Sequence, residues 1–318
     1  MRYVVYGAGA VGGVVGGTLA RAGRPVTLVA RGAHLDAIRA AGLVLDAGDG
    51  RHRIDAPATD TAAEVGWTDD TVVLLAVKSH QAAAALADLR AHAPTGTPVV
   101  CLTNGVATEA AVLRLFARTY AVCVMLPATH LEPGVVVASC HPTPAILDVG
   151  RFPGGTDATT AAVAADLRAA GIASEERADI MAMKRRKLVM NLGNGVDASF
   201  AQGAAADELA ALAQAEGERV LAAAGLTVAT ADEDRERRGA ILQRRTDLER
   251  RGGSTWQSLT RGTGDSEIDY LAGEVVLQGR LLGLPTPVNE AVVAATRHLA
   301  ATGGAPRSLD AGAVLASL

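Results

Sequence analysis

The chain opens with a spacing of glycines that suits phosphate binding. An apolar run at residues 1–6 leads directly into Gly7-Ala-Gly9-Ala-Val-Gly12, and a stretch rich in alanine, valine and glycine follows. Between a strand and a helix, the first glycine of such a motif permits a tight turn, the second lets the backbone approach a pyrophosphate, and the third lets the helix pack on the strand. The N–H groups at the helix start attract the phosphates. We therefore predict a dinucleotide site formed by Gly7, Ala8, Gly9, Ala10, Val11 and Gly12.

The end of the second predicted strand, residues 26–30, indicates which dinucleotide is bound. Folds selective for NAD usually carry Asp or Glu there, to bind the ribose 2′-hydroxyl. This chain has Arg31, and its nearest carboxylate is Asp36. An arginine can form a bidentate, charge-assisted contact with a 2′-phosphate, whereas the competing interpretation is a solvated surface arginine. We predict NADP(H) rather than NAD(H).

Further polar residues follow other predicted strands. Lys78, Asn104 and the segment Ala128–His130 each come directly after an apolar run. Ligands of open α/β sheets bind outside the carboxyl ends of the strands, so these residues are candidates to line one cleft.

A later helix, predicted at residues 181–190, carries a polar pair. Lys187 and Asn191 are four residues apart, hence on one helical face, and apolar residues 188–190 lie between them. Taken alone, such a pair is usual on a solvent-facing helix.

The elements that position these residues divide into two groups. Strand and helix patterns alternate in the first half, which predicts a Rossmann-type, doubly wound parallel sheet. Residues 135–150 are expected to be extended or a hairpin, and 232–251 a charged helix whose segment 232–238 is solvated. From about residue 180 the pattern is helical almost throughout. We predict an NADP-binding Rossmann-like domain at 1–178 and an all-helical substrate and catalytic domain at 179–318. The strands are expected at 1–6, 26–30, 71–77, 98–102, 120–126 and 172–173, and the helices at 13–21, 158–170, 181–190, 208–224, 232–251, 266–282 and 288–301.

Composition narrows the class of protein. The 318 residues are 49% hydrophobic and 20% charged, which is ample for a folded core, and the net charge of −4 gives no basic surface for nucleic acid. The chain lacks an apolar run long enough to span a membrane. Its three scattered cysteines are expected to be buried thiols, and no histidine spacing suggests a metal site. The first strand begins at residue 1 or 2, so no signal peptide is expected before the glycine motif, and we expect a cytoplasmic protein.

An ordered set of short motifs resembles the ketopantoate reductase (2-dehydropantoate 2-reductase) family. No single piece is very specific, but their order along almost the whole chain is. The matching pieces are residues 7–12, Val29–Gly32, Val77–Gln81, Thr103–Gly105, Lys187–Asn191, Ser254–Gln257, Glu267–Tyr270 and Gly283–Asn289.

The resemblance implies roles for several residues. The lysine matching Lys187 is the general acid in this family, and the glutamate matching Glu267 completes the site and reaches the coenzyme. Asparagines on the lysine's helix and the serine matching Ser254 hold the substrate. Residues matching Lys78, Asn104 and Ala128 touch the coenzyme. Hydride addition to a ketone leaves negative charge on the oxygen, which a positioned cation or proton donor stabilises.

The chain departs from the family pattern around the substrate. The second asparagine usually lies four residues after the first, but here Asn194 is three after Asn191, and Gly195 occupies the expected position. One inserted residue before Glu267 lets Thr255 compete with Ser254 for the serine role. The family's later substrate asparagine has no clear counterpart at residues 204–207.

These observations predict an NADPH-dependent reductase of a small 2-oxo acid, with 2-dehydropantoate reduced to (R)-pantoate as the leading reaction. A related reductase of another 2-oxo acid, or of an imine in specialised metabolism, is the alternative. A non-catalytic NADP-binding sensor is the second alternative. Members of the family occur as monomers and as dimers, so the resemblance is compatible with a homodimer.

Overall fold

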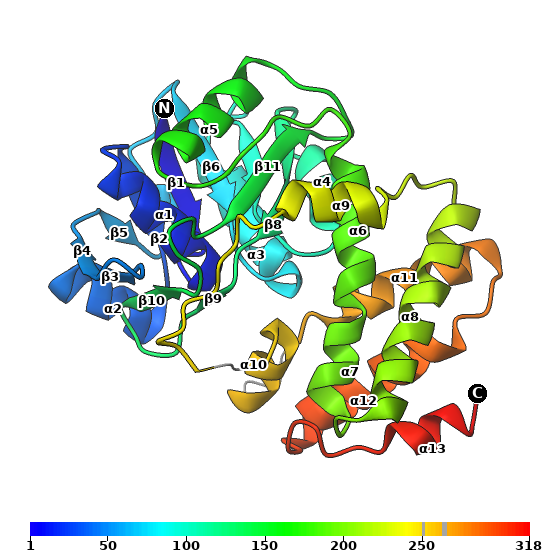
Figure 1. Cartoon of the computed structure of the whole chain (residues 1–318). Helices are drawn as coiled ribbons and strands as arrows, with labels where there is room; N and C mark the ends of the chain where they lie inside the picture. The colour runs from blue at the N-terminus through cyan, green and yellow to red at the C-terminus, as the bar shows by residue number, and fades with distance from the viewer. Residues whose placement is uncertain (250–251, 263–265) are drawn as a thin grey trace. The chain divides into compact units, whose positions relative to one another are not determined.

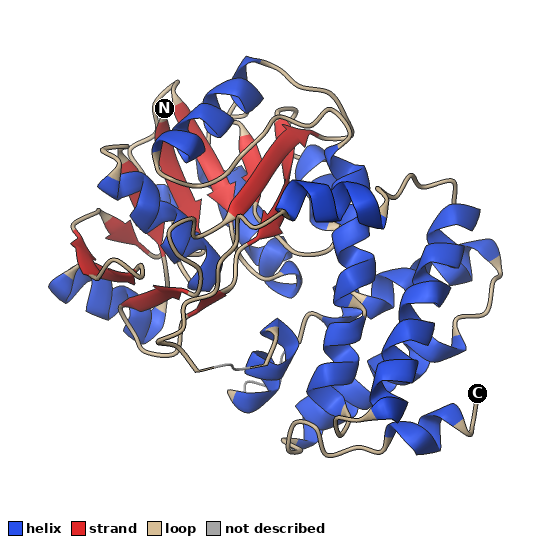
Figure 2. Cartoon of the chain, in the orientation of Figure 1, coloured by secondary structure: helices blue, strands red, loops and turns tan. Residues whose placement is uncertain are grey.

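A computed structural model describes residues 1–249, 252–262 and 266–318 (Figures 1 and 2). The chain forms two compact units. Unit 1 contains residues 1–103, 108–181 and 232–248, and unit 2 contains residues 104–107, 182–231 and 249–318. The chain therefore passes between the units several times.

Unit 1 is built on a seven-stranded sheet. Its strands are parallel except β11, which pairs antiparallel with β8. Strand β1 lies between β2 and β6, so the order of the strands reverses beside it, as at the ligand-binding switch point of doubly wound sheets. In spatial order the strands are β5 (Ala58–Thr59), β2 (Val26–Val29), β1 (Arg2–Tyr6), β6 (Thr71–Leu75), β7 (Val99–Cys101), β8 (Thr119–Met125) and β11 (Ile146–Arg151).

Helices cover both faces of this sheet because alternate residues of each buried strand face opposite sides. Tyr3 and Val5 of β1 pack with residues of α1 (Ala10–Arg21), α2 (Gly32–Ala41) and α5 (Ala158–Ala169). Val4 and Tyr6 pack on the other side. The elements there are η1 (Ala62–Glu64), α3 (Ala82–His92) and α4 (Thr108–Leu113), and η2 (Ser79–Gln81) precedes α3. The predicted Rossmann-type fold is confirmed.

A second, smaller sheet was not predicted. Its order is β4 (Arg51–Ile54), β3 (Leu43–Asp46), β10 (Val135–Ala138) and β9 (Ala128–Thr129). Of the two structures expected for residues 135–150, the extended one is confirmed and the hairpin is wrong, because β10 joins this sheet while β11 joins the large one. Helix α1 packs on β10 at Gly13, where a Cβ atom would lie 2.6 Å from Val136 Cγ1, so only glycine allows this approach.

Unit 2 is helical, as predicted (Figure 2). Leu192, Val196, Leu209, Val275 and Val292 lie in its core. None of the helices in the described part of the chain is long and apolar enough to cross a membrane. The elements are α6 (Ile180–Asn191), α7 (Gly193–Ser199), α8 (Ala204–Ala223), α10 (Ser254–Thr260), η3 (Ile268–Tyr270), α11 (Ala272–Leu282), α12 (Pro287–Thr302) and α13 (Ala311–Leu315).

Residues 232–248, which we call the strap, return to unit 1 late in the chain. The predicted helix 232–251 is wrong in its length, since α9 (Ala231–Arg238) ends early, and residues 250–251 lie outside the described residues. The solvated face predicted for residues 232–238 is also wrong at Arg237. Its side chain is 7% exposed and donates two hydrogen bonds of 2.7 Å to Asp148 of β11. A carboxylate as buried as Asp148 needs such a cation, because an unpaired buried charge is very costly.

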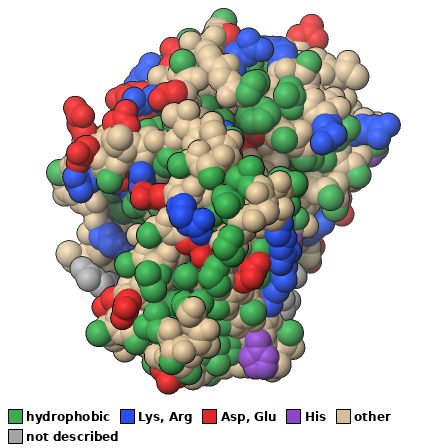
Figure 3. All heavy atoms as spheres, turned by 90° about the vertical axis from the view of Figure 1, so that its right-hand side faces the viewer, with side chains coloured by type: hydrophobic (Ala, Val, Ile, Leu, Met, Phe, Trp, Pro, Cys, Tyr) green, Lys and Arg blue, Asp and Glu red, His purple; other side chains and the backbone are tan. Residues whose placement is uncertain are grey.

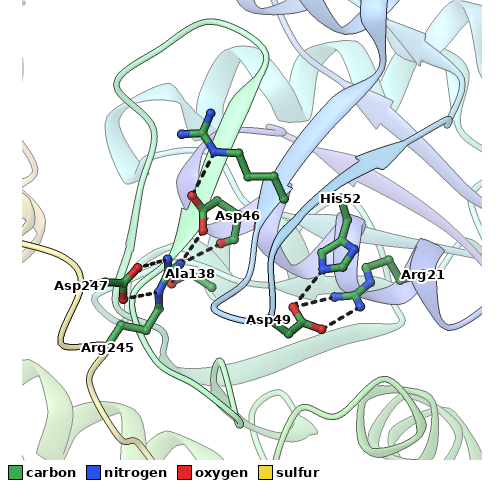
Figure 4. Close-up of polar contacts among 8 residues, drawn as sticks. Arg21, Asp46, Asp49, His52, Ala138, Arg245 and Asp247 are labelled. Carbon is green, nitrogen blue, oxygen red and sulfur yellow. Dashed lines mark hydrogen bonds and ion pairs between the residues drawn. The ribbon is translucent and has the colours of Figure 1, made fainter.

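The remainder of the strap runs beside the small sheet. Arg245 Nη1 lies 2.6 Å from Asp46 Oδ1 of β3, and Arg245 Nη2 lies 2.7 Å from Asp247 Oδ2 (Figure 4). Arg245 also donates to the Ala138 carbonyl at the end of β10. A backbone hydrogen bond from His141 to the Gln243 carbonyl adds to these side-chain contacts. These hydrogen bonds and ion pairs attach the strap to unit 1.

Candidate active site

The backbone of the glycine-rich loop requires glycine at positions 7 and 12. Gly7 has φ +102°, and a Cβ atom there would lie 2.8 Å from Val77 Cγ1. A side chain at Gly12 would overlap the Gly7 carbonyl and lie 2.9 Å from Val5 Cγ1, so the third glycine brings α1 onto β1. The N–H groups of Gly7 and Ala8 both bind the Val29 carbonyl of β2, at 3.0 and 2.9 Å.

Gly9 differs from the other two glycines because it faces open space. Among the described residues, no atom outside its chain neighbours and its own helix backbone lies within 4 Å of the position that its Cβ would take. Gly9 is the N-cap of α1, whose first turn contains no acidic residue. The first N–H groups of a helix have no partner within the helix, so this open end fits a diphosphate.

Arg31 is the residue predicted to contact the 2′-phosphate of the coenzyme. It directly precedes α2 as its N-cap residue, and its side chain is exposed. The Tyr6 hydroxyl near the same strand ends donates to Asp88 Oδ2 at 2.7 Å. Burial and this hydrogen bond raise the pKa of Tyr6 to about 12, and the Arg31 guanidinium acts in the opposite direction. Arg31 is thus placed beside the carboxyl ends of β1 and β2.

The predicted coenzyme contacts Lys78, Asn104 and Ala128 are divided between the units. Lys78 is half-buried and caps η2 after β6, and Ala128 lies in β9, paired with Ala138 of β10. Both belong to unit 1 with the glycine-rich loop. Asn104 belongs to unit 2.

Asn104 contacts the predicted general acid. Lys187 Nζ of α6 donates a hydrogen bond of 3.0 Å to Asn104 Oδ1. Gly105 has φ +76°, and a Cβ atom there would lie 2.7 Å from the Tyr270 carbonyl oxygen, so the loop 104–107 packs closely beside η3. Glu267, only 8% exposed, directly precedes η3. Three segments far apart in sequence thus supply Lys187, Asn104 and Glu267 to unit 2.

The two asparagines after the lysine lie on different helices. Helix α6 ends at Asn191 and α7 begins at Gly193, and both asparagines are partly exposed. A Cβ atom at Gly195 would lie 2.7 Å from Val292 Cγ1 and 2.8 Å from Ile268 Cδ1. The position where the family usually has asparagine therefore faces the core here, and a larger side chain would require these neighbours to shift. Asn194 lies one residue earlier.

The segment resembling the family's serine region is a helix rather than a loop. Ser254 is the first residue of α10 and is exposed, whereas Thr255 is buried. Helix α10 packs on α7, and Asn194 Oδ1 lies 3.5 Å from the Cβ position of Gly253. Ser254 and Asn194 therefore lie near each other in unit 2.

Other residues have packing roles. Trp256 of α10 packs in a small apolar cluster, and the Arg307 guanidinium carbon lies 5.9 Å from its ring centroid. The three cysteines are buried and unbridged, as expected. In the described segments, no group of His, Cys, Asp and Glu is arranged to hold a metal ion.

Sequence reasoning missed His34. This residue in the first turn of α2 contacts the glycine-rich loop, with its Nε2 atom 2.8 Å from the Ala8 carbonyl oxygen. Its ring also contacts that of His130, the last residue of the segment predicted to line the cleft. The only sequence signal was a histidine three residues after Arg31, and the spacing alone does not point it at the loop.

Helix α11 of unit 2 exposes apolar side chains. Leu277, Leu281 and Leu282 of α11 are 48%, 71% and 44% exposed. One face of the molecule shows hydrophobic side chains interspersed with basic and acidic ones (Figure 3).

Comparisons with known proteins agree over almost the whole length. The family model described as ketopantoate reductase PanE/ApbA matches residues 3–154, and the model of its C-terminal part matches residues 179–300. A 2-dehydropantoate 2-reductase of Mesorhizobium japonicum is 30% identical over 338 residues, which cover 96% of this chain and 99% of the relative.

Two solved structures share the fold. A PanE/ApbA family ketopantoate reductase from Ralstonia eutropha has a TM-score of 0.81 at 28% identity, covering 95% of this chain and 99% of the other. A D-mandelate dehydrogenase with NADH and anilino(oxo)acetate has a TM-score of 0.80 at 21% identity, covering 96% and 100%. At that identity the second likeness concerns the fold alone.

Proposed function

The chain belongs to the ketopantoate reductase family and is an oxidoreductase, and from this premise we propose that it reduces a small 2-oxo acid with NADPH. The first candidate reaction is 2-dehydropantoate to (R)-pantoate, the activity named for its relatives. The observation that carries the proposal is the Lys187–Asn104 hydrogen bond, which holds the Lys187 ammonium in the unit that also supplies Glu267 and the two asparagines.

Unit 1 is proposed to bind the coenzyme. The open N-terminus of α1 at Gly9 accepts the diphosphate, while Gly7 and Gly12 fix the loop. Arg31 is exposed and follows the end of β2, where the chain has no carboxylate. An arginine at this position favours binding of a 2′-phosphate over a free 2′-hydroxyl. Lys78 and Ala128 complete this side of the proposed site.

The bound coenzyme would supply a hydride to the carbonyl carbon of the substrate. Lys187 would then stabilise the negative charge that grows on the carbonyl oxygen and give it a proton from Nζ. Asn104 accepts one of the three N–H donors of this ammonium, and so orients the others. Glu267 is proposed to complete the site beside the lysine.

The choice of lysine over arginine supports an acid role. The chain contains 30 Lys and Arg residues, of which only three are lysines, at positions 78, 184 and 187. Arginine therefore serves at almost every place where the chain needs a fixed positive charge. A guanidinium keeps its proton at all physiological pH values, whereas an ammonium can donate one.

Substrate binding is proposed for Asn191, Asn194 and Ser254. We favour Ser254 over Thr255 because the serine is exposed at the start of α10 and the threonine is buried. The close packing at Gly195 supports the second candidate, a reductase of a different 2-oxo acid or imine, because it displaces an amide that the family usually has in the next position.

A panel of 2-oxo acids tests the proposal, with oxidation of NADPH followed by its absorbance. Turnover should be fastest with 2-dehydropantoate and should require NADPH. A clearly faster rate with another oxo acid or an imine would select the second candidate. Tight binding of NADPH without turnover of any compound would indicate a sensor and overturn the proposed enzyme activity.

A further inference from the structure

The ring of His34 is held in a single protonation state by two backbone groups. Its Nε2 atom lies 2.8 Å from the Ala8 carbonyl oxygen, and the Gly134 N–H donates to its Nδ1 atom at 2.9 Å. A carbonyl oxygen accepts and an amide N–H donates, so the ring must carry its proton on Nε2 and none on Nδ1. Burial lowers the pKa of His34, as does the neighbouring His130, although the Ala8 carbonyl opposes them.

The Ala8 carbonyl that His34 binds sets the direction of the Gly9 N–H, the candidate hydrogen-bond donor to the diphosphate. The Ala8 carbonyl and the Gly9 N–H belong to the same peptide plane, and in a trans peptide they point in opposite directions. The Ala8 N–H on the preceding peptide is bound by the Val29 carbonyl at 2.9 Å. With both sides of Ala8 fixed, the Gly9 N–H has one orientation, and Gly9 is the residue with open space beside it.

His34 is itself held by the turn between β9 and β10. The rings of His34 and His130 have their centroids 4.0 Å apart, and His130 Nδ1 lies 3.1 Å from the Val135 carbonyl oxygen. Gly134 has φ +79°, and a Cβ atom there would lie 2.9 Å from Ala37 Cβ of α2. The imidazole thus joins this turn to the glycine-rich loop through well-defined contacts.

We propose that His34 is a positioning residue for coenzyme binding, which orients the Gly9 N–H toward the diphosphate by donating to the Ala8 carbonyl. The inference rests on the proposed function, since it concerns the same dinucleotide site. Removal of the donor weakens coenzyme binding and leaves the chemical step, which Lys187 performs in unit 2, unchanged.

Three substitutions separate the donor from the bulk of the ring. His34→Leu removes both polar contacts. His34→Gln places an amide N–H near the position of Nε2, whereas the shorter His34→Asn does not reach it. His298→Leu, at an exposed position of α12, is the matched control. The measurements are the dissociation constant of NADPH by calorimetry, kcat at saturating coenzyme, and the midpoint of thermal unfolding.

We expect His34→Leu and His34→Asn to raise the dissociation constant of NADPH about tenfold, the effect of one lost hydrogen bond. Their kcat should stay within about twofold of wild type, because the reacting groups are unchanged. His34→Gln should recover most of the affinity. Should His34→Leu fail to fold, the comparison of glutamine with asparagine still decides the question.

Wild-type affinity in His34→Asn, or equal losses in the glutamine and asparagine variants, would overturn the inference. Failure of the wild-type protein itself to bind NADPH would instead overturn the proposed function. The two failures are therefore distinguishable.

Discussion

The coenzyme loop proposed in unit 1 and the catalytic group proposed in unit 2 are constructed in different ways. The proposed phosphate-binding loop uses backbone N–H groups, and its three glycines lie within six consecutive residues. The proposed catalytic group uses side chains, and Asn104, Lys187 and Glu267 come from segments separated by about eighty residues each. A backbone site needs a local conformation, whereas a side-chain site needs several distant segments to pack correctly.

The structural cations and the proposed catalytic cation also differ. Arginine makes the fixed contacts, such as Arg237 with Asp148 in unit 1 and Arg186 with Glu218 in unit 2. Unit 2 keeps Lys187, partly exposed, against a neutral amide. A permanent charge suits a structural ion pair, and an ammonium beside a neutral acceptor suits proton transfer.

Substitution of Lys187 should have the largest effect. Lys187→Ala should lower kcat about 10³-fold, the usual contribution of a general acid, while NADPH binding stays near wild type. Lys187→Arg keeps the charge but cannot release a proton, and should be almost as slow. Steady-state kinetics and calorimetry provide the measurements. Near-normal turnover in Lys187→Arg would show that unit 2 needs only a charge there.

Arg237 tests whether the strap is an integral part of unit 1. Arg237→Ala leaves the Asp148 carboxylate, 1% exposed, without its bidentate partner, and should lower the free energy of unfolding by about 3 kcal/mol or more. Arg21→Ala breaks a largely exposed pair with Asp49, seen in Figure 4, and should cost less than about 1 kcal/mol. Chemical denaturation measures both. Equal losses would mean that burial of the Arg237 pair contributes nothing.

Arg31 tests the coenzyme preference of unit 1. Arg31→Ala should weaken NADPH binding by about 2 kcal/mol, as for one charge-assisted contact, and leave NADH binding almost unchanged. The ratio of the two dissociation constants is the informative quantity. A similar loss for both coenzymes would remove Arg31 from recognition of the 2′-phosphate.

Ser254 and Thr255 should give the smallest but most selective difference. Ser254→Ala should raise KM for the oxo acid about fivefold, equivalent to about 1 kcal/mol of binding free energy, with the unfolding midpoint unchanged. Thr255→Ala, at a buried position, should lower the unfolding midpoint and change KM little. The reverse pattern would assign the serine role to Thr255.

The sequence alone determined the features that depend on local spacing. Glycine spacing after an apolar strand predicted the loop at Gly7–Gly12, because its conformation is set by residues without Cβ atoms. Alternation of strands and helices predicted the sheet, and helical periodicity predicted most of unit 2. Resemblance to a known family added Lys187 and Glu267 as candidates, which spacing could not supply.

Tertiary structure decided everything that joins distant residues. The small sheet pairs β3 with β10, about ninety residues later, and the strap returns to unit 1 because Asp148 and Asp46 need buried cations. The fold buries Gly195 against Val292 and Ile268, and it brings His34 to Ala8. Periodicity and propensity act over a few residues, whereas these contacts depend on which surfaces remain to be buried once the local elements have formed.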